Sequence, residues 1–280
     1  MMHGPLWQRL LRGTRWVWRS TRYRDALPDD LDATVMTLDA RDRLHAKQGR
    51  STARVVFHGP AGPLPVYLKR HYRLPWRDRL AAALQPGGRH SPASAEWAHL
   101  ARARELGIAV PDAVAAGERI GPWGELQSYL LVAELTGCEA LNEVLPQLVN
   151  ALRPPEFHAL KRALIAEMVD ISARLHQACA FHKDLYLCHF YLDLGRLDAA
   201  GSRLALIDLH RMAEHRLWPD RWRWKDLGQL LYSTYGVAGI DDRDRLRFWA
   251  LYRRRLALKR HRWHRARIQR KAARYLAHNR

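Results

Sequence analysis

Two short motifs in the second half of the chain constrain its fold more than any other feature. The first is a His-x-Asp turn, His182 to Asp184, which opens a stretch that runs to Phe190. The second is the run from Leu206 to Asp208, in which an acid ends a short apolar segment. An acid after a tight turn can accept a proton from a hydroxyl, and an acid at a strand end can hold Mg²⁺ against phosphate oxygens. The order predicts a catalytic loop and a metal-binding loop on adjacent strands.

The composition is that of a globular protein with a strong positive charge. The chain has 280 residues, 48% of them hydrophobic, enough for one large domain or two lobes with a substantial core. Its formal net charge of +19 predicts an anionic partner: a nucleic acid, an anionic membrane surface or a phosphorylated substrate. The 3 cysteines fit no zinc spacing and suit a reducing compartment. We expect neither a transmembrane helix nor a signal peptide.

Residues 1–33 are predicted to form a basic amphipathic segment. Its arginines recur at helical spacing, with tryptophans and leucines between them, at Arg9, Arg12, Arg15, Arg19 and Arg22. Two interpretations remain open: a basic helix that lies in a membrane interface, or a helix packed on the fold with a solvated basic face.

Residues 34–134 predict an antiparallel sheet with one helix. Strands rich in β-branched residues and separated by turn residues are expected at 35–38, 43–46, 53–57, 66–69, 113–115 and 128–133. A basic connector begins at Arg70, and a helix over residues 94–106 ends at Gly107. A hinge follows at Glu134.

Residues 135–280 predict a mostly helical region. Apolar residues from Pro155 onward recur every three to four positions and indicate a long buried helix. Two short strands are expected around Gly195 and Gly201, and helices resume at Trp222. The basic tail predicts one or two amphipathic helices with Leu251, Leu256, Leu258 and Ile268 facing inward. The whole order predicts an α+β fold with two lobes and a cleft between them.

The candidate functional residues follow the order found in protein kinases. That set is a strand lysine, a helix glutamate, an H-R-D-L-x-x-x-N loop and a D-F-G loop. Here the order is Lys69, Glu96, the loop from His182 to His189, and Asp208. Two features depart from it: His189 replaces the asparagine and is a less usual Mg²⁺ ligand, and the loop over the phosphates has a single glycine, at position 49. His189 can instead orient Asp184 or contact substrate.

The stretch from His182 to Phe190, with Ile207 to Arg211, resembles the lipopolysaccharide core heptose kinase family of Gram-negative bacteria. That family carries an H-x-D-x-Y-x-C-H-F segment and an I-D-L-H-R segment, and it also has histidine at the position of His189. The similarity covers residues 35 to 255, with further matches at Tyr67–Lys69, Glu96–Trp97, Glu105–Ile108, Trp222–Leu227, Tyr232–Ser233, Arg243–Asp244 and Arg247–Phe248.

The resemblance implies a protein-kinase-like fold that binds ATP and Mg²⁺ and phosphorylates a hydroxyl of an inner-core heptose. The first heptose is the expected acceptor. By position, Asp184 accepts the hydroxyl proton, with His182 as the second catalytic residue. Asp208 and His189 are assigned to the metal.

The same resemblance assigns four residues to the nucleotide. Lys69 contacts the α- and β-phosphates and pairs with Glu96, while Gly49 and Glu134 line the nucleotide site. Asp226 is expected to brace the catalytic loop rather than touch substrate.

The implied acceptor is a lipid A-linked glycolipid, which predicts a cytoplasmic protein held peripherally on the inner face of the cytoplasmic membrane. Arginines of the connector and the tail are candidates for contacts with Kdo carboxylates and lipid A phosphates, including Arg70, Arg73, Arg77 and Arg79. The alternative for these charges is a solvated face.

Three other functions are alternatives. A nucleic-acid binder fits the charge, but no recognised binding motif is present, so no nucleic-acid partner is expected. A kinase-like scaffold without activity is disfavoured by the retention of Lys69, Asp184 and Asp208. A sister kinase for the second heptose, Kdo or a protein tyrosine stays open, because acceptor choice depends on pocket shape.

Overall fold

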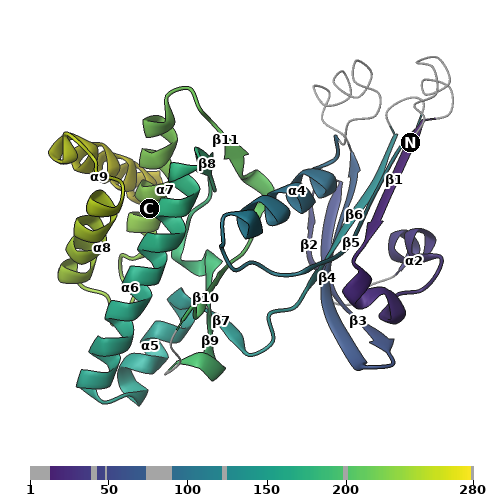
Figure 1. Ribbon diagram of the computed structural model, residues 1–280, viewed down its shortest axis with the longest axis horizontal. Coiled ribbons are helices and arrows are strands. Elements are labelled where there is room, and N and C mark those ends of the chain that lie inside the picture. Colours follow the sequence, from purple (N-terminus) through teal and green to yellow (C-terminus); the bar gives the residue numbers. More distant parts are fainter. Residues whose placement is uncertain are drawn as a thin grey trace. The chain divides into compact units, whose positions relative to one another are not determined.

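The structure is a computed structural model, and it describes residues 13–38, 43–47, 49–73, 90–121, 125–197 and 201–278 (Figure 1). The chain divides into two compact units. Unit 1 comprises Met1–Ala101 with Pro111–Leu135, and unit 2 comprises Arg102–Val110 with Thr136–Arg280.

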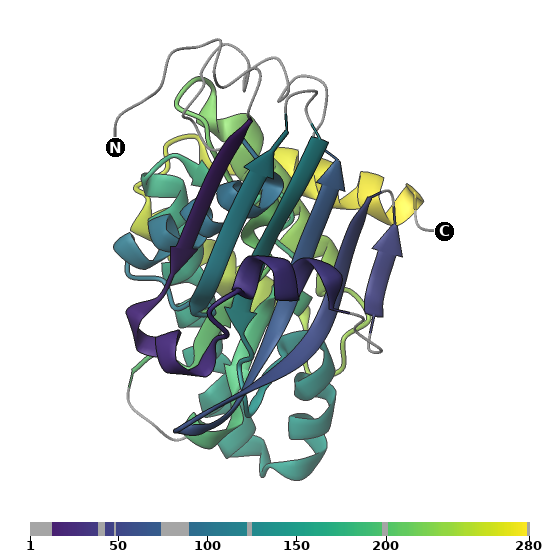
Figure 2. The ribbon, with the colours of Figure 1, turned by 90° about the vertical axis from the view of Figure 1, so that its right-hand side faces the viewer.

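Unit 1 is built on an antiparallel sheet with strand order β1-β5-β6-β4-β3-β2. Its strands are β1 (Thr14–Arg19), β2 (Arg43–Lys47), β3 (Arg50–Gly59), β4 (Gly62–Arg73), β5 (Ala113–Ile120) and β6 (Glu125–Ala133). The helices that accompany the sheet are η1 (Thr21–Ala26), α2 (Leu31–Thr37) and α4 (Pro92–Glu105). Figure 2 shows α2 lying across one face of the sheet.

Side chains alternate between the two faces of the sheet, as strand geometry requires. Val66 and Leu68 are fully buried in a cluster with Leu31 and Val35 of α2. The other face carries α4, whose Trp97 packs against tryptophans of β1. The sheet is therefore covered on both faces within unit 1.

The strand predicted at residues 35–38 is wrong, because this segment belongs to α2. Leu31 and Val35 lie one helical turn apart, and both have no exposed surface. Residues four apart share one face of a helix, so both side chains pack on the sheet. Burial of that face outweighs the preference of the β-branched residues for strand structure.

The helix predicted for the basic N-terminal segment is wrong where the structure describes it. Thr14–Arg19 forms the edge strand β1, which pairs with β5. Trp16 and Trp18 pack on Trp97 with ring centroids 5.2 and 5.4 Å apart. Residues two apart share one face of a strand, so this packing favours strand over helix. Residues 1–12 lie outside the described part of the chain.

The connector predicted to begin at Arg70 begins later, because β4 continues to Arg73. Arg70 is buried, and its guanidinium donates to the carbonyl oxygens of Val35 (3.2 Å) and Leu38 (2.8 Å) at the end of α2. A cation there satisfies carbonyl groups that the helix leaves unpaired. Arg70 is therefore a structural residue, and its predicted contact with a glycolipid is wrong. Residues 74–89 lie outside the described part.

Unit 2 is mostly helical, with two small antiparallel sheets of order β10-β9-β7 and β11-β8. Its strands are β7 (Cys138–Ala140), β8 (Ala180–Phe181), β9 (Phe190–Asp193), β10 (Leu204–Leu206) and β11 (Ala213–Glu214). The helices are α5 (Leu141–Ala151), α6 (Pro154–Gln177), α7 (Pro219–Ser233), α8 (Asp242–Arg255) and α9 (His261–His278). Short turns are η2 (Leu187–His189), η3 (Leu194–Arg196) and η4 (Leu209–Arg211).

The helical predictions for unit 2 are confirmed. The apolar positions of α6 that predicted a buried helix are all buried: Leu160, Leu164, Met168, Ile171 and Leu175. Ile268 of α9 lies in a core cluster with Tyr252, and Leu251, Leu256 and Leu258 pack against it. The expected α+β class is therefore confirmed. Among the described residues, no helix combines the length and apolar character needed to cross a bilayer.

Candidate active site

Unit 1 contributes a charged pair at the centre of its sheet. Lys69 lies on β4, opposite Thr52 of β3 and Leu130 of β6. Its Nζ lies 2.5 Å from Oε1 of Glu96 on α4. The Glu96 side chain is only 3% exposed, and a carboxylate that deeply buried requires a charged partner. The predicted Lys69–Glu96 pair is present.

Glu134 follows β6, and its carboxylate is held within unit 1. Arg54 binds both oxygens, at 2.9 and 2.8 Å, and the Tyr67 hydroxyl donates to Oε1 at 3.2 Å. The hydrogen bond from Arg54 lowers the pKa of Glu134. The Glu134 N–H donates to the carbonyl of Pro65 at 3.0 Å, so its backbone extends the sheet.

Gly49 lies in the turn between β2 and β3. Its φ of 78° is left-handed, a conformation that glycine adopts without steric cost. Its carbonyl accepts a hydrogen bond from the Tyr72 N–H at 2.8 Å, which fixes the turn against β4.

In unit 2, the backbone of the predicted catalytic loop is fixed by a buried carboxylate. Asp226 of α7 has no exposed surface, and it accepts hydrogen bonds from the N–H groups of His182 and Lys183, both at 2.8 Å. The Nε2 of His176 lies 3.3 Å from the same carboxylate. Lys183 has a φ of 68°, so the bonds to Asp226 hold a left-handed residue in place. The expected bracing role of Asp226 is confirmed.

His182 lies beneath this loop and not on its surface, with no exposed area. Its Nε2 lies 2.9 Å from the carbonyl oxygen of Ile207. Because a carbonyl only accepts, Nε2 carries the proton. Burial lowers the pKa of His182, which keeps the ring neutral. The side chain therefore joins the predicted catalytic loop to the residue that precedes Asp208.

Asp184 projects from the braced loop, and its side chain is 13% exposed. Arg211 lies 3.0 Å from Oδ2, the Gln229 amide donates to Oδ1 at 3.2 Å, and Lys225 Nζ lies 3.8 Å from Oδ1. Lys225 also donates to the carbonyl of Lys183. Burial lowers the pKa of Lys225, and the charge of Asp184 opposes that shift. Donors from α7 and η4 thus set the direction of the Asp184 carboxylate.

The two predicted metal ligands face one another. Nε2 of His189 lies 3.7 Å from Oδ2 of Asp208, while Oδ1 of Asp208 lies 2.7 Å from Nδ1 of His210. Nδ1 of His189 lies 2.7 Å from the carbonyl of Asp184 and therefore carries the proton. Nε2 is therefore the ring atom of His189 that faces Asp208.

No group of three or more His, Cys, Asp or Glu side chains in the described ranges is arranged to hold a metal ion. Mg²⁺ usually binds one or two protein ligands and takes the rest from phosphates and water. Asp208 and His189 fit that pattern as a pair of acceptors.

Sequence reasoning missed three residues of this site: Arg211, Lys225 and Gln229. Arg211 and Lys225 stood within matched family segments but were given no role there. Lys225 and Gln229 are four apart on α7 and so share the helix face that points at the loop. That face cannot be recognised before the long-range contact is known.

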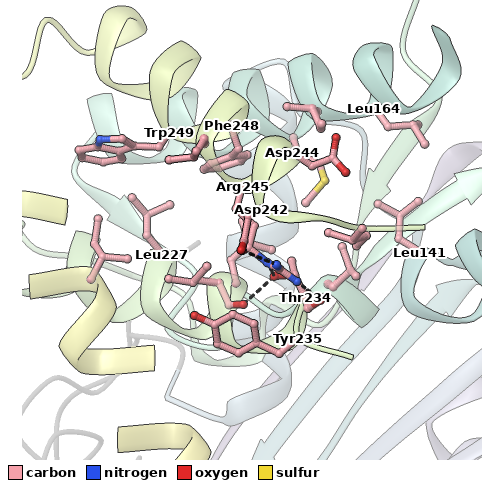
Figure 3. Close-up of a pocket in the computed structure, with 18 of the residues that line it drawn as sticks. Leu141, Leu164, Leu227, Thr234, Tyr235, Asp242, Asp244, Arg245, Phe248 and Trp249 are labelled. Atoms are coloured by element: carbon pink, nitrogen blue, oxygen red, sulfur yellow. Dashed lines mark hydrogen bonds and ion pairs between the residues drawn. The ribbon is translucent and has the colours of Figure 1, made fainter. Parts of the chain in front are cut away.

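A second feature of unit 2 is an apolar cavity of about 380 Å³ among α5 to α9 (Figure 3). Leu141, Leu164 and Leu227 lie along it. Arg245 bridges the Thr234 hydroxyl at 3.0 Å and Asp242 at 2.8 Å, which gives the cavity a polar edge.

A strand lysine paired with a helix glutamate, a braced His-x-Asp loop and a second acid loop define a kinase-like phosphotransferase. The profile of the Lipopolysaccharide kinase (Kdo/WaaP) family matches residues 42–252, and the chain belongs to this family. The resemblance found in the sequence is confirmed, and the chain is a kinase that uses ATP as phosphoryl donor.

The relatives extend this result. The chain is 35% identical over 213 residues to the lipopolysaccharide core heptose(I) kinase WaaP of Pseudomonas aeruginosa, covering 74% of this chain and 75% of that protein. It is 32% identical over 164 residues to the protein of the same name from Escherichia coli K12, covering 57% and 59%. A solved structure of WaaP in complex with acyl carrier protein is similar with a TM-score of 0.68 and 29% identity, covering 92% of this chain and 98% of that one.

The brace can be tested with Asp226→Asn. The amide keeps the size but loses the charge that binds two N–H groups, so we expect a loss of about 1–3 kcal/mol in unfolding free energy. We also expect kcat to fall because the loop is displaced. The KM for ATP should change by a smaller factor than kcat. Urea unfolding and steady-state kinetics measure both. Asp242→Asn, at an exposed position of α8, is the control and should cost under about 1 kcal/mol. Equal effects of the two variants would contradict the brace.

The buried histidines predict a pH dependence of stability. Burial lowers the pKa of both His176 and His182 in the folded state. Below about pH 6.5 the unfolded chain takes up protons that the folded chain does not. The free energy of unfolding should therefore fall as pH drops below that value. Urea unfolding of His182→Gln should show a shallower dependence than wild type.

His158→Gln, at an exposed position of α6, is the matched control and should keep the wild-type slope. If the unfolding free energy of His182→Gln depended on pH as steeply as that of wild type, His182 would not contribute to the pH dependence of stability.

Proposed function

We propose that the chain phosphorylates a heptose of the lipopolysaccharide inner core, with heptose I as the acceptor. The observation that carries this proposal is the Asp184 loop, braced by Asp226 and directed by Arg211 and Gln229. The names of the relatives, heptose(I) kinases at 35% and 32% identity, support the choice of sugar.

In this proposal Asp184 accepts the proton of the attacking sugar hydroxyl. Phosphoryl transfer depends on positioning and charge neutralisation, and a directed carboxylate supplies the first. Lys225 and Arg211 keep the carboxylate in one orientation until the hydroxyl replaces one of its partners. His182 acts as a positioning residue, because a side chain with no exposed surface cannot touch substrate.

The nucleotide site is assigned by the same reasoning. Lys69 contacts the α- and β-phosphates while Glu96 fixes its ammonium group. Gly49 lets the β2–β3 turn approach the phosphates without a side chain. Glu134 lines the proposed nucleotide site through its backbone, because its carboxylate is bound by Arg54 and Tyr67.

Asp208 and His189 would hold Mg²⁺, since their acceptor atoms face each other. A bound Mg²⁺ would neutralise charge on the phosphates.

We also propose that the chain works at the inner face of the cytoplasmic membrane, where a lipid A-linked acceptor lies. The net charge of +19 favours an anionic surface, and α9 carries several exposed arginines. Heptose II or Kdo as acceptor would use the same loop with a different sugar pocket.

Asp184→Asn tests the assignment of the base. The amide keeps the shape but cannot accept the proton, so kcat should fall about 10²–10⁴-fold. The assay is transfer of labelled phosphate from ATP to a deacylated inner-core oligosaccharide. Asp170→Asn, on the surface of α6, is the control and should keep wild-type turnover. Full activity of Asp184→Asn would remove this residue from the mechanism.

The solved relative described as a complex with acyl carrier protein suggests a second partner. We propose that this chain also binds acyl carrier protein, with an acyl chain entering the apolar cavity of unit 2. The cavity is lined by leucines and other apolar side chains, which suits a hydrocarbon chain.

Filling the cavity tests this proposal. Leu164→Trp should weaken binding of palmitoyl-loaded acyl carrier protein about tenfold or more, because the hydrocarbon loses its buried site. Isothermal titration calorimetry measures the affinity, and the acyl-free carrier protein is the matched ligand control. Equal binding of the loaded and acyl-free forms would exclude the cavity as the acyl site.

A further inference from the structure

The loop between β11 and α7 exposes two large apolar residues side by side. Leu217 is 86% exposed and Trp218 is 81% exposed, the highest values among the large exposed hydrophobic residues of the described chain. Scattered single exposed apolar residues need no explanation, but an adjacent leucine and tryptophan form a projecting apolar tip. Figure 1 shows this loop at one end of unit 2, between β11 and α7.

The tip is held in its exposed position by the backbone. Trp218 is the residue before α7 and has φ 53° and ψ 54°, a left-handed conformation that a tryptophan rarely adopts. Pro219 begins the helix directly after it. On the other side, the His215 N–H donates to the carbonyl of Cys179 at 2.8 Å. The loop is thus fixed at both ends, and its strained residue is one of the two that project.

Aromatic and cationic side chains surround the base of the tip. The ring of His215 stacks on Trp222 at 4.1 Å. Lys183 Nζ lies 5.1 Å from the Trp222 ring and the Arg221 guanidinium lies 5.6 Å from it. The neighbouring Arg216 is also exposed.

The two acids of the segment are paired with arginines. Glu214 lies 2.9 Å from Arg102, and Asp220 pairs with Arg223. The charge that the tip presents outward is therefore positive, from Arg216 and Arg221.

The same loop is joined to the catalytic loop. β11 pairs with β8, with Ala213 opposite Phe181, and Phe181 directly precedes His182. Lys183, the residue before Asp184, reaches Trp222. The tip is therefore connected to the proposed base, Asp184, through the β11–β8 pairing and the contact between Lys183 and Trp222.

We propose that Leu217 and Trp218 insert into the interface of an anionic lipid bilayer and orient Asp184 toward a lipid-anchored acceptor. Tryptophan prefers the headgroup region, leucine the adjoining acyl region, and flanking arginines attract anionic lipid. This inference rests on the proposed function for its acceptor, but the insertion itself does not require that the chain phosphorylates heptose.

Vesicle binding tests the tip. The full chain is sedimented with vesicles of phosphatidylethanolamine and phosphatidylglycerol, and the double variant Leu217→Ser/Trp218→Ser is compared with wild type. Loss of two inserted apolar side chains should weaken binding about tenfold or more. The control is Val56→Ser, at an exposed apolar residue of β3 in unit 1, which should bind like wild type. Thermal melting confirms that each variant is folded.

A second measurement reports on insertion directly. The difference in tryptophan emission between wild type and Trp218→Phe reports the emission of Trp218. Brominated lipid in the same vesicles should quench that emission. Unchanged vesicle binding by the double variant, an equal loss in Val56→Ser, or no quenching of that emission would overturn the proposal. Phosphate transfer plays no part in these readouts, so a failed insertion and a failed kinase assignment are separate results.

Discussion

The loop that carries Asp184 depends on one buried carboxylate. Asp226 has no exposed surface and binds two consecutive backbone N–H groups, which hold the left-handed turn at Lys183. A buried charge is stable only when fully bonded, so the turn and Asp226 require one another. The turn aims Asp184, and it places His182 against Ile207. The position of the proposed base and that of the proposed metal loop therefore follow from the same interaction.

Much of this arrangement was predictable from the sequence, because the signals are local or carried by motif order. The apolar residues of α6 recur every three to four positions, and turn residues separate β3 from β4. These local patterns predict the elements without tertiary information. The Lys69–Glu96 pair followed from the order of a strand lysine and a helix glutamate, and the structure contains it. The brace by Asp226 followed from the family resemblance.

The failed predictions share a physical cause, which is packing between distant segments. α2 is a helix because Leu31 and Val35 bury one face on the sheet, and the local β-branched run does not show this. The arginine spacing before residue 24 suggested a helix, yet Trp16 and Trp18 form a strand face against α4. Arg70 was expected to be a surface charge, but its guanidinium binds carbonyl oxygens at the C-terminal end of α2. Gln229 carried no signal, because its hydrogen bond to Asp184 exists only once α7 lies against the loop that carries Asp184.

The central claim is that this chain phosphorylates an inner-core heptose of lipopolysaccharide. Mass spectrometry of the lipopolysaccharide core from cells with and without the protein tests it most directly, because it reports the phosphate and the sugar that carries it. The account predicts that cells lacking the protein lose a phosphate from heptose I and regain it when the gene is restored. An unchanged core, or a phosphate lost only from another sugar, would contradict it.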